Sequence, residues 1–357
     1  MKKRISIQDI AKELGISKTS ISWIINGKAK ENRIGEALEK RVLDHIAKVG
    51  YQPNQFARGL RTGKTNTIAV LVEDISDPFF AGIVRVIEES VYTEGYKIVC
   101  SSTENDTNKT KDIIAAFRSR QVDGFIIAPP PGIEEDIKGL LSDNFPVVLF
   151  DRYFPSVPTD NITVDNYQGA YDAMSYFYEC GHKNVGFVTL ISDQMQMQAR
   201  LNGYMRATDD NKADYYIKRI GFDQDLESTV IDIKKFISSN NALDGLFFST
   251  NYLAYAGLEA IQSLGLKMPD ELGVIVFDDD YFFRLFNPPI TAVEQPIRKI
   301  SENIITLMLN KLTTQGKKIE PKNIVLPTNL VVRKSTRNYD VVKPILNEKF
   351  DEERQKV

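Results

Sequence analysis

Polar and aromatic side chains stand just after several apolar runs that have the length and composition of β-strands. Carboxylates and amides bind sugar hydroxyl groups, aromatic rings stack on sugar rings, and arginines hold phosphate or carboxylate groups by forked hydrogen bonds. Where parallel strands share one sheet, ligands bind beyond the carboxyl ends of those strands. The residues selected on this basis as contacts for a small polar ligand are Asp77, Phe79, Asp151, Arg152, Asp165, Asn251 and Asp278. Arg200 is added to them as an arginine at the start of a predicted helix, well placed to point into the same cleft.

Each of these residues also has an ordinary structural interpretation. A single Asp after a strand is more often a helix cap than a ligand, and the run Asp278–Asp280 could be a solvated turn. Paired carboxylates also occur in glycosidases, but nothing in the sequence fixes their separation, and a catalytic domain leaves the basic N-terminal segment unexplained. The set as a whole favours a binding cleft. We expect replacement of Arg200 or Asp278 to abolish a ligand response without loss of the fold.

A second group of residues with recognisable chemistry lies in residues 7–26, which predict two short helices joined by a tight turn. Gly15 ends the first helix and Ser17 is a suitable N-cap for the second. The second helix buries Ile21, Ile24 and Ile25 and turns hydroxyl, amide, cationic and aromatic side chains outward. Such a face suits a helix that enters a DNA major groove, although a plain surface hairpin has the same pattern.

Charge separates these two interpretations of the N-terminal segment. Residues 1–64 contain fourteen Lys and Arg against six Asp and Glu, a net charge of +8, whereas the whole chain carries -3. A small basic segment on an acidic chain is the electrostatic pattern of a nucleic-acid-binding domain.

The composition limits the remaining possibilities. The chain is 42% hydrophobic and 26% charged, as soluble globular proteins are, and no apolar stretch approaches the roughly 20 residues of a membrane span. We therefore expect a cytoplasmic protein. Cys100 and Cys180 have no metal-ligand spacing, and His45 and His182 lack a catalytic constellation. The sequence predicts no enzyme activity, no metal and no cofactor.

Alternating strands and helices from Thr67 onward predict an α/β fold with two doubly wound lobes of parallel sheet. Expected strands are 67–72, 97–102, 124–128, 147–151, 161–165, 185–190, 216–220, 245–249 and 272–277. A third helix at 35–49 completes a three-helix N-terminal domain, residues 1–50. Residues 51–66 form a linker with a marginal helix.

Several sequence motifs resemble the lactose and galactose repressor family of bacterial transcription regulators. They are I-Q-D-I-A-K-E-L-G-I-S from Ile7, I-I-N-G from Ile24, Y-Q-P-N-Q-F-A-R-G-L from Tyr51, D-P-F-F from Asp77, A-R-L-N-G-Y from Ala199, F-D-D from Phe277 and N-P-P-I-T-A-V from Asn287. The likeness extends to about Arg333. It implies a helix-turn-helix domain, a linker helix and a periplasmic-binding-protein-like core over 67–334.

The resemblance also implies how these domains are divided and used. Lobe 1 would comprise about 67–162 and 293–326, and lobe 2 about 163–292 and 327–334, with a charged tail at 335–357. A homodimer would bind double-stranded operator DNA, with Leu60 wedged between central base pairs unless it is a core residue. The DNA-contacting residues implied are Ser17, Lys18, Thr19, Ser20, Ser22, Trp23, Asn26, Lys28, Ala57 and Leu60.

A closer likeness, in I-N-G-K-A-K-x-x-R-I from Ile25, is to the fructose repressor branch of that family. Trp23 fits that branch, which has an aromatic residue there. The branch implies a repressor of carbohydrate metabolism genes controlled by a sugar or sugar phosphate between the lobes. Two residues depart from relatives: Val276 replaces a frequent glycine, and Gln194 replaces the arginine of the purine repressor. The alternative is a cytoplasmic sugar-binding or sugar-processing protein without operator binding.

Overall fold

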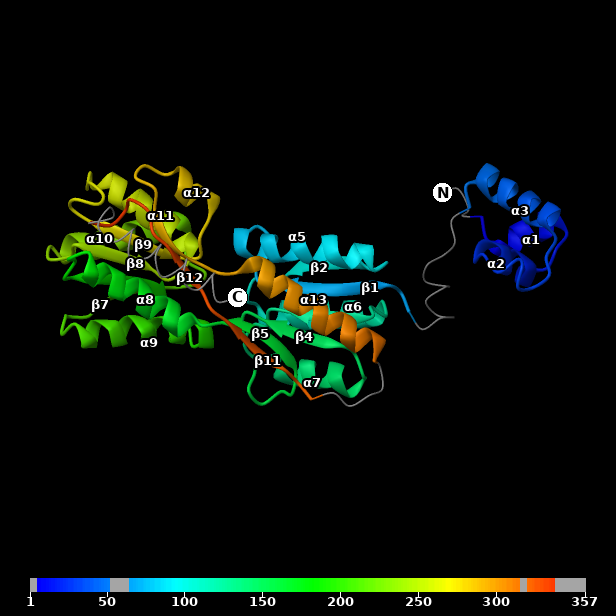
Figure 1. Cartoon of the computed structure of the whole chain (residues 1–357), viewed down its shortest axis with the longest axis horizontal. Helices are drawn as coiled ribbons and strands as arrows, with labels where there is room; N and C mark the ends of the chain where they lie inside the picture. The colour runs from blue at the N-terminus through cyan, green and yellow to red at the C-terminus, as the bar shows by residue number, and fades with distance from the viewer. Residues whose placement is uncertain (1–4, 52–63, 315–319, 338–357) are drawn as a thin grey trace, which may run out of the picture. The chain divides into compact units, whose positions relative to one another are not determined.

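The computed structural model describes residues 5–51, 64–314 and 320–337 and divides the chain into two compact units, Met1–Thr65 and Asn66–Val357. The first unit contains α1 (Ile7–Leu14), α2 (Lys18–Ile25) and α3 (Glu36–Val49) (Figure 1). Ser6 and Asp9 form a capping box at the start of α1. Gly15 ends this helix in the left-handed conformation, with φ of 66°, which costs glycine little.

The first unit has a small apolar core that joins its three helices. Ile10 of α1, Ile21 and Ile24 of α2, and Val42 of α3 are buried against one another together with Ala29. Two polar contacts add to this packing, because Arg41 donates to the Leu14 carbonyl and His45 lies 2.9 Å from Glu13. The predicted helical hairpin and third helix are therefore confirmed.

The second unit contains two six-stranded sheets, each the centre of one lobe. Lobe 1 has the strand order β11-β5-β4-β3-β1-β2 with every neighbouring pair parallel. Its strands are β1 (Thr67–Val72), β2 (Lys97–Ser102), β3 (Gly124–Ile127), β4 (Val147–Phe150), β5 (Asp160–Val164) and β11 (Asn323–Leu326). Lobe 2 has the order β12-β10-β9-β8-β6-β7, in which β12 alone is antiparallel to its neighbour. Its strands are β6 (Val185–Leu190), β7 (Tyr216–Ile220), β8 (Gly245–Phe248), β9 (Gly273–Phe277), β10 (Thr291–Glu294) and β12 (Asn329–Val331).

Helices cover both faces of each sheet, so the central strands β3 and β4 of lobe 1 and β8 and β9 of lobe 2 are buried along their whole length. In lobe 1, α5 (Pro78–Thr93) and α13 (Ile297–Thr313) pack on one face, and α6 (Thr107–Ser119) and α7 (Glu134–Ser142) on the other. In lobe 2, α8 (Asn166–Glu179) and α9 (Met195–Asp210) cover one face. The opposite face carries α10 (Leu226–Ser239), α11 (Asn251–Ser263) and the short α12 (Tyr281–Leu285).

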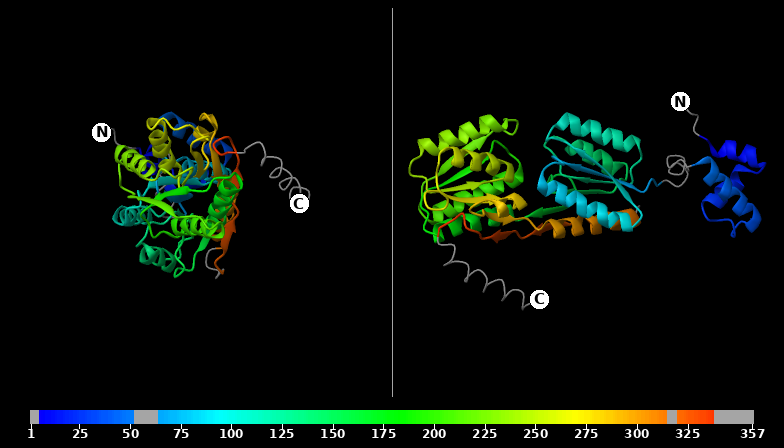
Figure 2. Two further views of the ribbon diagram at one scale, coloured as in Figure 1. Left: turned by 90° about the vertical axis from the view of Figure 1, so that its left-hand side faces the viewer. Right: turned by 90° about the horizontal axis from the view of Figure 1, so that it is seen from above.

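The chain passes between the lobes three times within the described residues. It leaves lobe 1 after β5 to form α8, returns after β10 to form α13, and crosses again between β11 and β12 (Figure 2). The two doubly wound lobes predicted from the sequence are confirmed. The sequence pattern did not predict α12, α13 or strands β10 to β12.

The end of the body differs slightly from the predicted start of the tail at residue 335. Ser335 and Thr336 are buried, and the Ser335 hydroxyl donates to the Val274 carbonyl and accepts from the Thr291 amide. These small polar residues therefore belong to lobe 2. In the parts of the chain that the structure describes, no helix is long and apolar enough to cross a membrane.

Candidate functional site

Helix α2 and the turn after it carry the candidate DNA contacts that the structure describes. Ser17 is the N-cap of α2, and its hydroxyl accepts a hydrogen bond from the Ser20 amide at 3.0 Å. At the other end, the Asn26 side chain donates to the Ser22 carbonyl at 2.5 Å. These residues therefore fix the ends of the helix as well as lying on its polar face. Two further candidates, Ala57 and Leu60, lie outside the described residues.

The remaining candidates on α2 point away from the small core. Lys18, Thr19 and Lys28 are exposed, and Trp23 is half-buried. The opposite side of the helix is anchored by the buried Ile21 and Ile24. A polar, cationic and aromatic face on an anchored helix can make both phosphate and base contacts in a major groove.

A polar cavity lies between the two lobes, beyond the carboxyl ends of their strands. Six of the eight ligand contacts predicted from the sequence line it: Asp77, Phe79, Asp151, Arg200, Asn251 and Asp278. Its other lining residues are Glu73, Phe80, Leu190, Gln194, Gln196, Met197, Thr250, Tyr252 and Gln295. The cavity measures about 50 Å³, room for a few water molecules.

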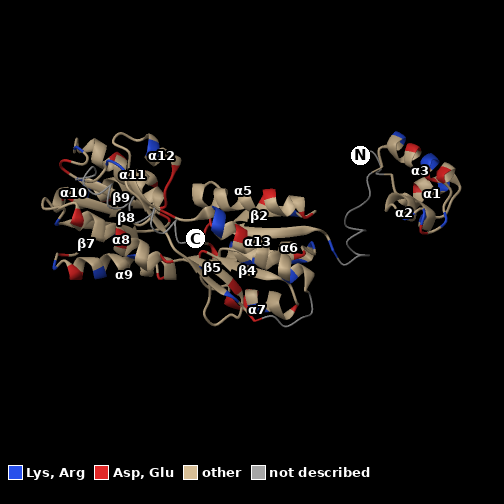
Figure 3. Ribbon diagram, viewed as in Figure 1, with Lys and Arg blue, Asp and Glu red and all other residues tan. Residues whose placement is uncertain are grey.

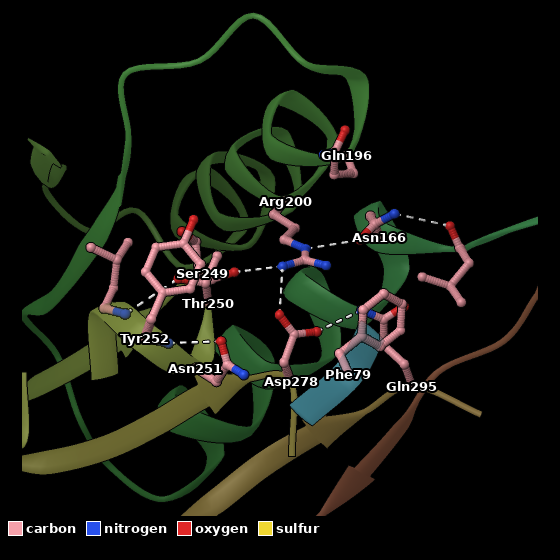
Figure 4. Close-up of polar contacts among 12 residues, drawn as sticks. Phe79, Asn166, Gln196, Arg200, Ser249, Thr250, Asn251, Tyr252, Asp278 and Gln295 are labelled. Atoms are coloured by element: carbon pink, nitrogen blue, oxygen red, sulfur yellow. Dashed lines mark hydrogen bonds and ion pairs between the residues drawn. The ribbon is translucent and has the colours of Figure 1, made fainter. Parts of the chain in front are cut away.

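Arg200 on α9 is the centre of the lobe 2 half of this cavity (Figure 4). Its guanidinium group donates to Asn166 Oδ1 at 2.8 Å, to the Ser249 carbonyl at 2.6 Å and to Asp278 Oδ2 at 3.1 Å. Its Cζ atom also lies 3.6 Å from the centre of the Phe277 ring. The arginine is 2% exposed, so these contacts both neutralise its buried charge and fix its orientation.

A hydrogen bond between residues that line the cavity joins the two lobes directly. Asn251, the first residue of α11, donates from Nδ2 to Asp77 Oδ2 at 3.0 Å. Asp77 is also the N-cap of α5, where it accepts from the Phe79 amide. Burial raises the pKa of Asp77 to about 6, although the hydrogen bond from Asn251 opposes this rise. The predicted ligand contacts of the two lobes are thus in direct contact with each other.

Asp151 and Arg152 follow β4 but face different spaces. Asp151 lines the 50 Å³ cavity, and burial raises its pKa to about 6 despite the nearby Arg152 and Arg200 guanidinium groups. Its backbone is left-handed, with φ of 66°, a conformation that is strained for a residue with a side chain. Arg152 turns away from that cavity and contacts Glu73 and Asn105 instead.

The structure contradicts the assignment of Asp165 to the cleft. Asp165 is the N-cap of α8, and its carboxylate accepts a hydrogen bond from the Gln168 amide at 2.9 Å. The amides at the start of the helix engage this carboxylate, and Asp165 is not among the residues that line the cavity. The next residue, Asn166, contacts Arg200 instead.

Several cavity residues were not selected from the sequence. Glu73 directly follows β1, so its position after a strand was a usable signal that the prediction passed over. Gln295 follows β10, which the pattern did not reveal, and it donates to Asp278 Oδ1 at 2.6 Å. Gln196 and Tyr252 lie within helices, where no strand end marks them.

A larger cavity of about 690 Å³ also spans the two lobes and shares Leu190 and Gln194 with the first. Its walls are largely aromatic, aliphatic and acidic. They comprise Glu104, Asn105, Asp106, Pro129, Pro131, Glu134, Arg152, Tyr153, Phe154, Pro155, Ile191, Ser192, Asp193, Met195, Phe222 and Asp223. Stacking surfaces beside hydrogen-bonding groups suit a flat, hydroxyl-rich ligand. Figure 3 shows acidic residues in the segments between the lobes.

Two parts of the chain match known sequence families. Residues 6–54 match the family described as bacterial regulatory proteins, lacI family. Residues 174–336 match the periplasmic binding protein-like domain.

Similar proteins with assigned functions are transcriptional regulators by name. HTH-type transcriptional repressor PurR of Photobacterium profundum is 28% identical over 338 residues, which cover 93% of this chain and 99% of that protein. Catabolite control protein A of Priestia megaterium is 28% identical over 340 residues, with coverage of 93% and 99%.

Solved structures agree in fold. The lac repressor dimer bound to operator and the anti-inducer ONPF has a TM-score of 0.79 at 20% identity, covering 94% of this chain and all of that chain. A LacI family transcriptional regulator from Enterococcus faecium with bound ribose has a TM-score of 0.69 at 23% identity, covering 76% and 98%.

The helix-turn-helix unit and the two-lobed body define a DNA-binding regulator with a periplasmic-binding-protein-like domain. Its helix-turn-helix segment matches the lacI family of bacterial regulatory proteins, and over most of its length the chain is similar to DNA-binding transcriptional repressors of this kind.

Proposed function

We propose that this repressor controls carbohydrate metabolism genes and that a small carbohydrate, bound between the lobes, acts as its effector. The observation that carries this proposal is the meeting of carboxylate and amide groups from both lobes, centred on the hydrogen bond from Asn251 to Asp77. Such groups pair with sugar hydroxyls, and the neighbouring aromatic walls offer stacking surfaces. A similar fold that holds ribose supports the choice of ligand class.

For DNA binding, we propose a cytoplasmic homodimer that binds a palindromic operator. The polar face of α2 would occupy the major groove in each half-site, with Lys18 and Trp23 on that face. Residues 51–66 would form the linker that enters the minor groove, and Leu60 would be the intercalating residue. This part follows from the family resemblance, and the exposed, capped α2 supports it.

Effector binding would change operator affinity by favouring one arrangement of the lobes over another. The coupling is at most as large as the difference in effector affinity between those two arrangements. Because the Asn251–Asp77 hydrogen bond spans the lobes, a ligand that replaces it acts directly on their arrangement.

The test of this function measures binding of the full-length protein to the DNA upstream of its own gene and neighbouring genes. We expect nanomolar binding that exceeds binding to random duplex by about a thousandfold or more at physiological salt. At least one carbohydrate should change this affinity. Equal binding to native and random duplex contradicts the repressor proposal.

Lys18→Ala sharpens the DNA test. Loss of one phosphate contact should weaken binding across sequences and reduce the salt slope by about one. Lys40→Ala removes the same charge from exposed α3 and serves as the matched control. Equal effects of the two substitutions would indicate general attraction and not docking through α2. Leu60→Ala should reduce DNA bending while leaving effector affinity unchanged.

The branch resemblance named a sugar phosphate as the leading effector, with Arg152 and Arg200 as phosphate contacts. An unphosphorylated sugar is the other possibility within the same proposal. The contacts made by these two arginines bear directly on that choice.

A further inference from the structure

Arg152 is already neutralised within lobe 1. Its Nη2 atom donates to Glu73 Oε2 at 2.5 Å, its Nη1 donates to Asn105 Oδ1 at 3.0 Å, and its Nε lies 3.3 Å from Asp151 Oδ2. The arginine side chain is 4% exposed, and those of Glu73 and Asp151 are 14% and 8% exposed. Two carboxylates therefore surround one guanidinium group, at a position where a phosphate would need that group to be free.

Arg200 is held within lobe 2. Its Nε atom donates to Asn166, its Nη1 atom donates to the Ser249 carbonyl and to Asp278, and its guanidinium face covers the Phe277 ring. A phosphate at Nη1 would compete with Asp278, and displacing that carboxylate would leave it without its cation in a largely buried place.

The charges around the two cavities point the same way. Among the lining residues that the structure describes, nine carry carboxylates and two, Arg152 and Arg200, carry positive charge. No lysine or histidine is among them. A phosphate monoester carries about -1.5 to -2 at pH 7, so entry into this acidic surrounding is electrostatically unfavourable. A neutral sugar has no such penalty, and carboxylates accept hydrogen bonds from its hydroxyls.

We propose that Glu73 is a specificity-determining residue that holds Arg152 away from phosphate groups, so that the cleft accepts uncharged carbohydrates and rejects their phosphate esters. This inference rests on the proposed effector site between the lobes. Glu73 thus helps to select the ligand. Arg152, held in place by Glu73, forms part of the wall between the two cavities.

The experiment measures binding of fructose 1-phosphate, glucose 6-phosphate, ribose 5-phosphate and inorganic phosphate by calorimetry and thermal shift. The proteins are the full-length wild type, Glu73→Gln and Glu73→Ala. Glu73→Gln keeps the side-chain shape, and Glu73→Ala removes the hydrogen bond to Arg152 altogether. The unphosphorylated sugars are measured alongside.

Glu104→Gln is the matched control. It removes one negative charge from the wall of the 690 Å³ cavity that Arg152 also lines, but Glu104 pairs with half-buried Lys109 and not with Arg152. A general change in cavity charge would therefore appear in this variant too. Melting temperature and operator binding check that each variant is folded.

We expect no binding of the phosphorylated probes to the wild type or to Glu104→Gln. At least one Glu73 variant should bind at least one of them about tenfold more tightly or better. Binding of a phosphorylated probe to the wild type overturns the inference. Absence of binding in both Glu73 variants overturns the role of Glu73. Failure of every sugar to change operator affinity contradicts the proposed function instead, and the phosphate measurements are independent of it.

Discussion

The two lobes have the same strand order, and an aspartate follows the third strand of each sheet. Asp151 follows β4 in lobe 1, and Asp278 follows β9 in lobe 2. Both have left-handed backbones, with φ of 66° and 78°. Both backbone amides also donate to the neighbouring strand, to the carbonyls of Ile162 and Val293 respectively. The two lobes therefore place equivalent carboxylates on the two sides of one cavity.

The partners of these two carboxylates differ. Asp278 accepts from Arg200 of α9 and from Gln295 after β10, so side chains from two separate elements fix its position. Asp151 has the guanidinium group of the very next residue beside it, and that group is shared with Glu73. Lobe 2 thus holds a preformed polar network, whereas lobe 1 holds a carboxylate with a raised pKa whose neighbour Arg152 lines the larger cavity. Equivalent positions in similar folds can serve as a rigid support on one side and as a selective wall on the other.

The largest expected effect is the difference between removing Arg200 and removing Arg152. Arg200→Met leaves Asp278 largely buried without its cation and should lower the free energy of unfolding by about 3–5 kcal/mol. Arg152→Met should cost about 1–3 kcal/mol, because Arg152 lines the 690 Å³ cavity and water that enters there can reach the groups it leaves unpaired. Urea unfolding measures both. Equal losses of unfolding free energy in the two variants would contradict the view that the polar network of lobe 2 is more rigid than that of lobe 1.

This predicted loss differs from the sequence-based expectation that Arg200 could be replaced without loss of the fold. The burial of Arg200 and its contact with a backbone carbonyl make it part of the lobe 2 core. A milder substitution for testing effector response is Asn251→Ala, since Asn251 lies at the interface between the lobes.

A medium effect should come from glycine substitutions at close helix and strand contacts. In lobe 2, a Cβ atom on Gly203 of α9 would overlap the backbone carbonyl of Tyr167 on α8. In lobe 1, a Cβ atom on Gly124 of β3 would lie 2.7 Å from Met308 Sδ, the flexible part of a side chain. Gly203→Ala should therefore destabilise by about 1–3 kcal/mol.

Gly124→Ala is the matched substitution and should cost less, about 1 kcal/mol or below, because methionine can rearrange. Differential scanning calorimetry of the two variants compares them. A larger loss for Gly124→Ala would show that lobe 1 packs as tightly as lobe 2.

The smallest effect concerns pH. The pKa of Asp77 is about 6 in the folded protein, above the ordinary value of 3.8, because burial disfavours its charge. The folded state thus takes up this proton first as pH falls. The contribution of Asp77 to stability should rise between about pH 7 and pH 4, and below that range both states are protonated.

Asp77→Asn removes this titration while asparagine still caps α5. Its melting temperature relative to the wild type should be highest at pH 7 and decline toward pH 5. Asp151 titrates in the same direction in both proteins, so it cancels in this difference. A difference that stays constant with pH would contradict the raised pKa of Asp77.

Much of the fold could be predicted from the sequence because its signals are local. Buried strands such as β4 are continuous apolar runs, and caps such as Ser17 mark helix starts. The segment after Phe277 was harder, because β12 has three residues and α13 pairs with α5, far away in sequence. Only tertiary contacts assign such elements to a lobe.

The candidate site could be predicted in part for the same reason. The rule that ligand contacts follow parallel strands selected five cavity residues, among them Asp77 and Asp278, and Arg200 was selected as an arginine at a helix start. It failed for Asp165, since a cap and a ligand contact look alike in sequence. It could not indicate that Arg152 is paired with Glu73, which is 79 residues away and meets it only in the folded sheet.

The three chain crossings between the lobes have a mechanical consequence. A single linker lets two bodies swivel and separate freely, whereas three segments that cross the same gap resist twisting and pulling apart. Bending toward or away from the cavity remains the soft motion, because it needs only small dihedral changes in each segment. The three segments therefore form a hinge with few degrees of freedom. A ligand that binds in the cleft mainly changes the angle between the two lobes.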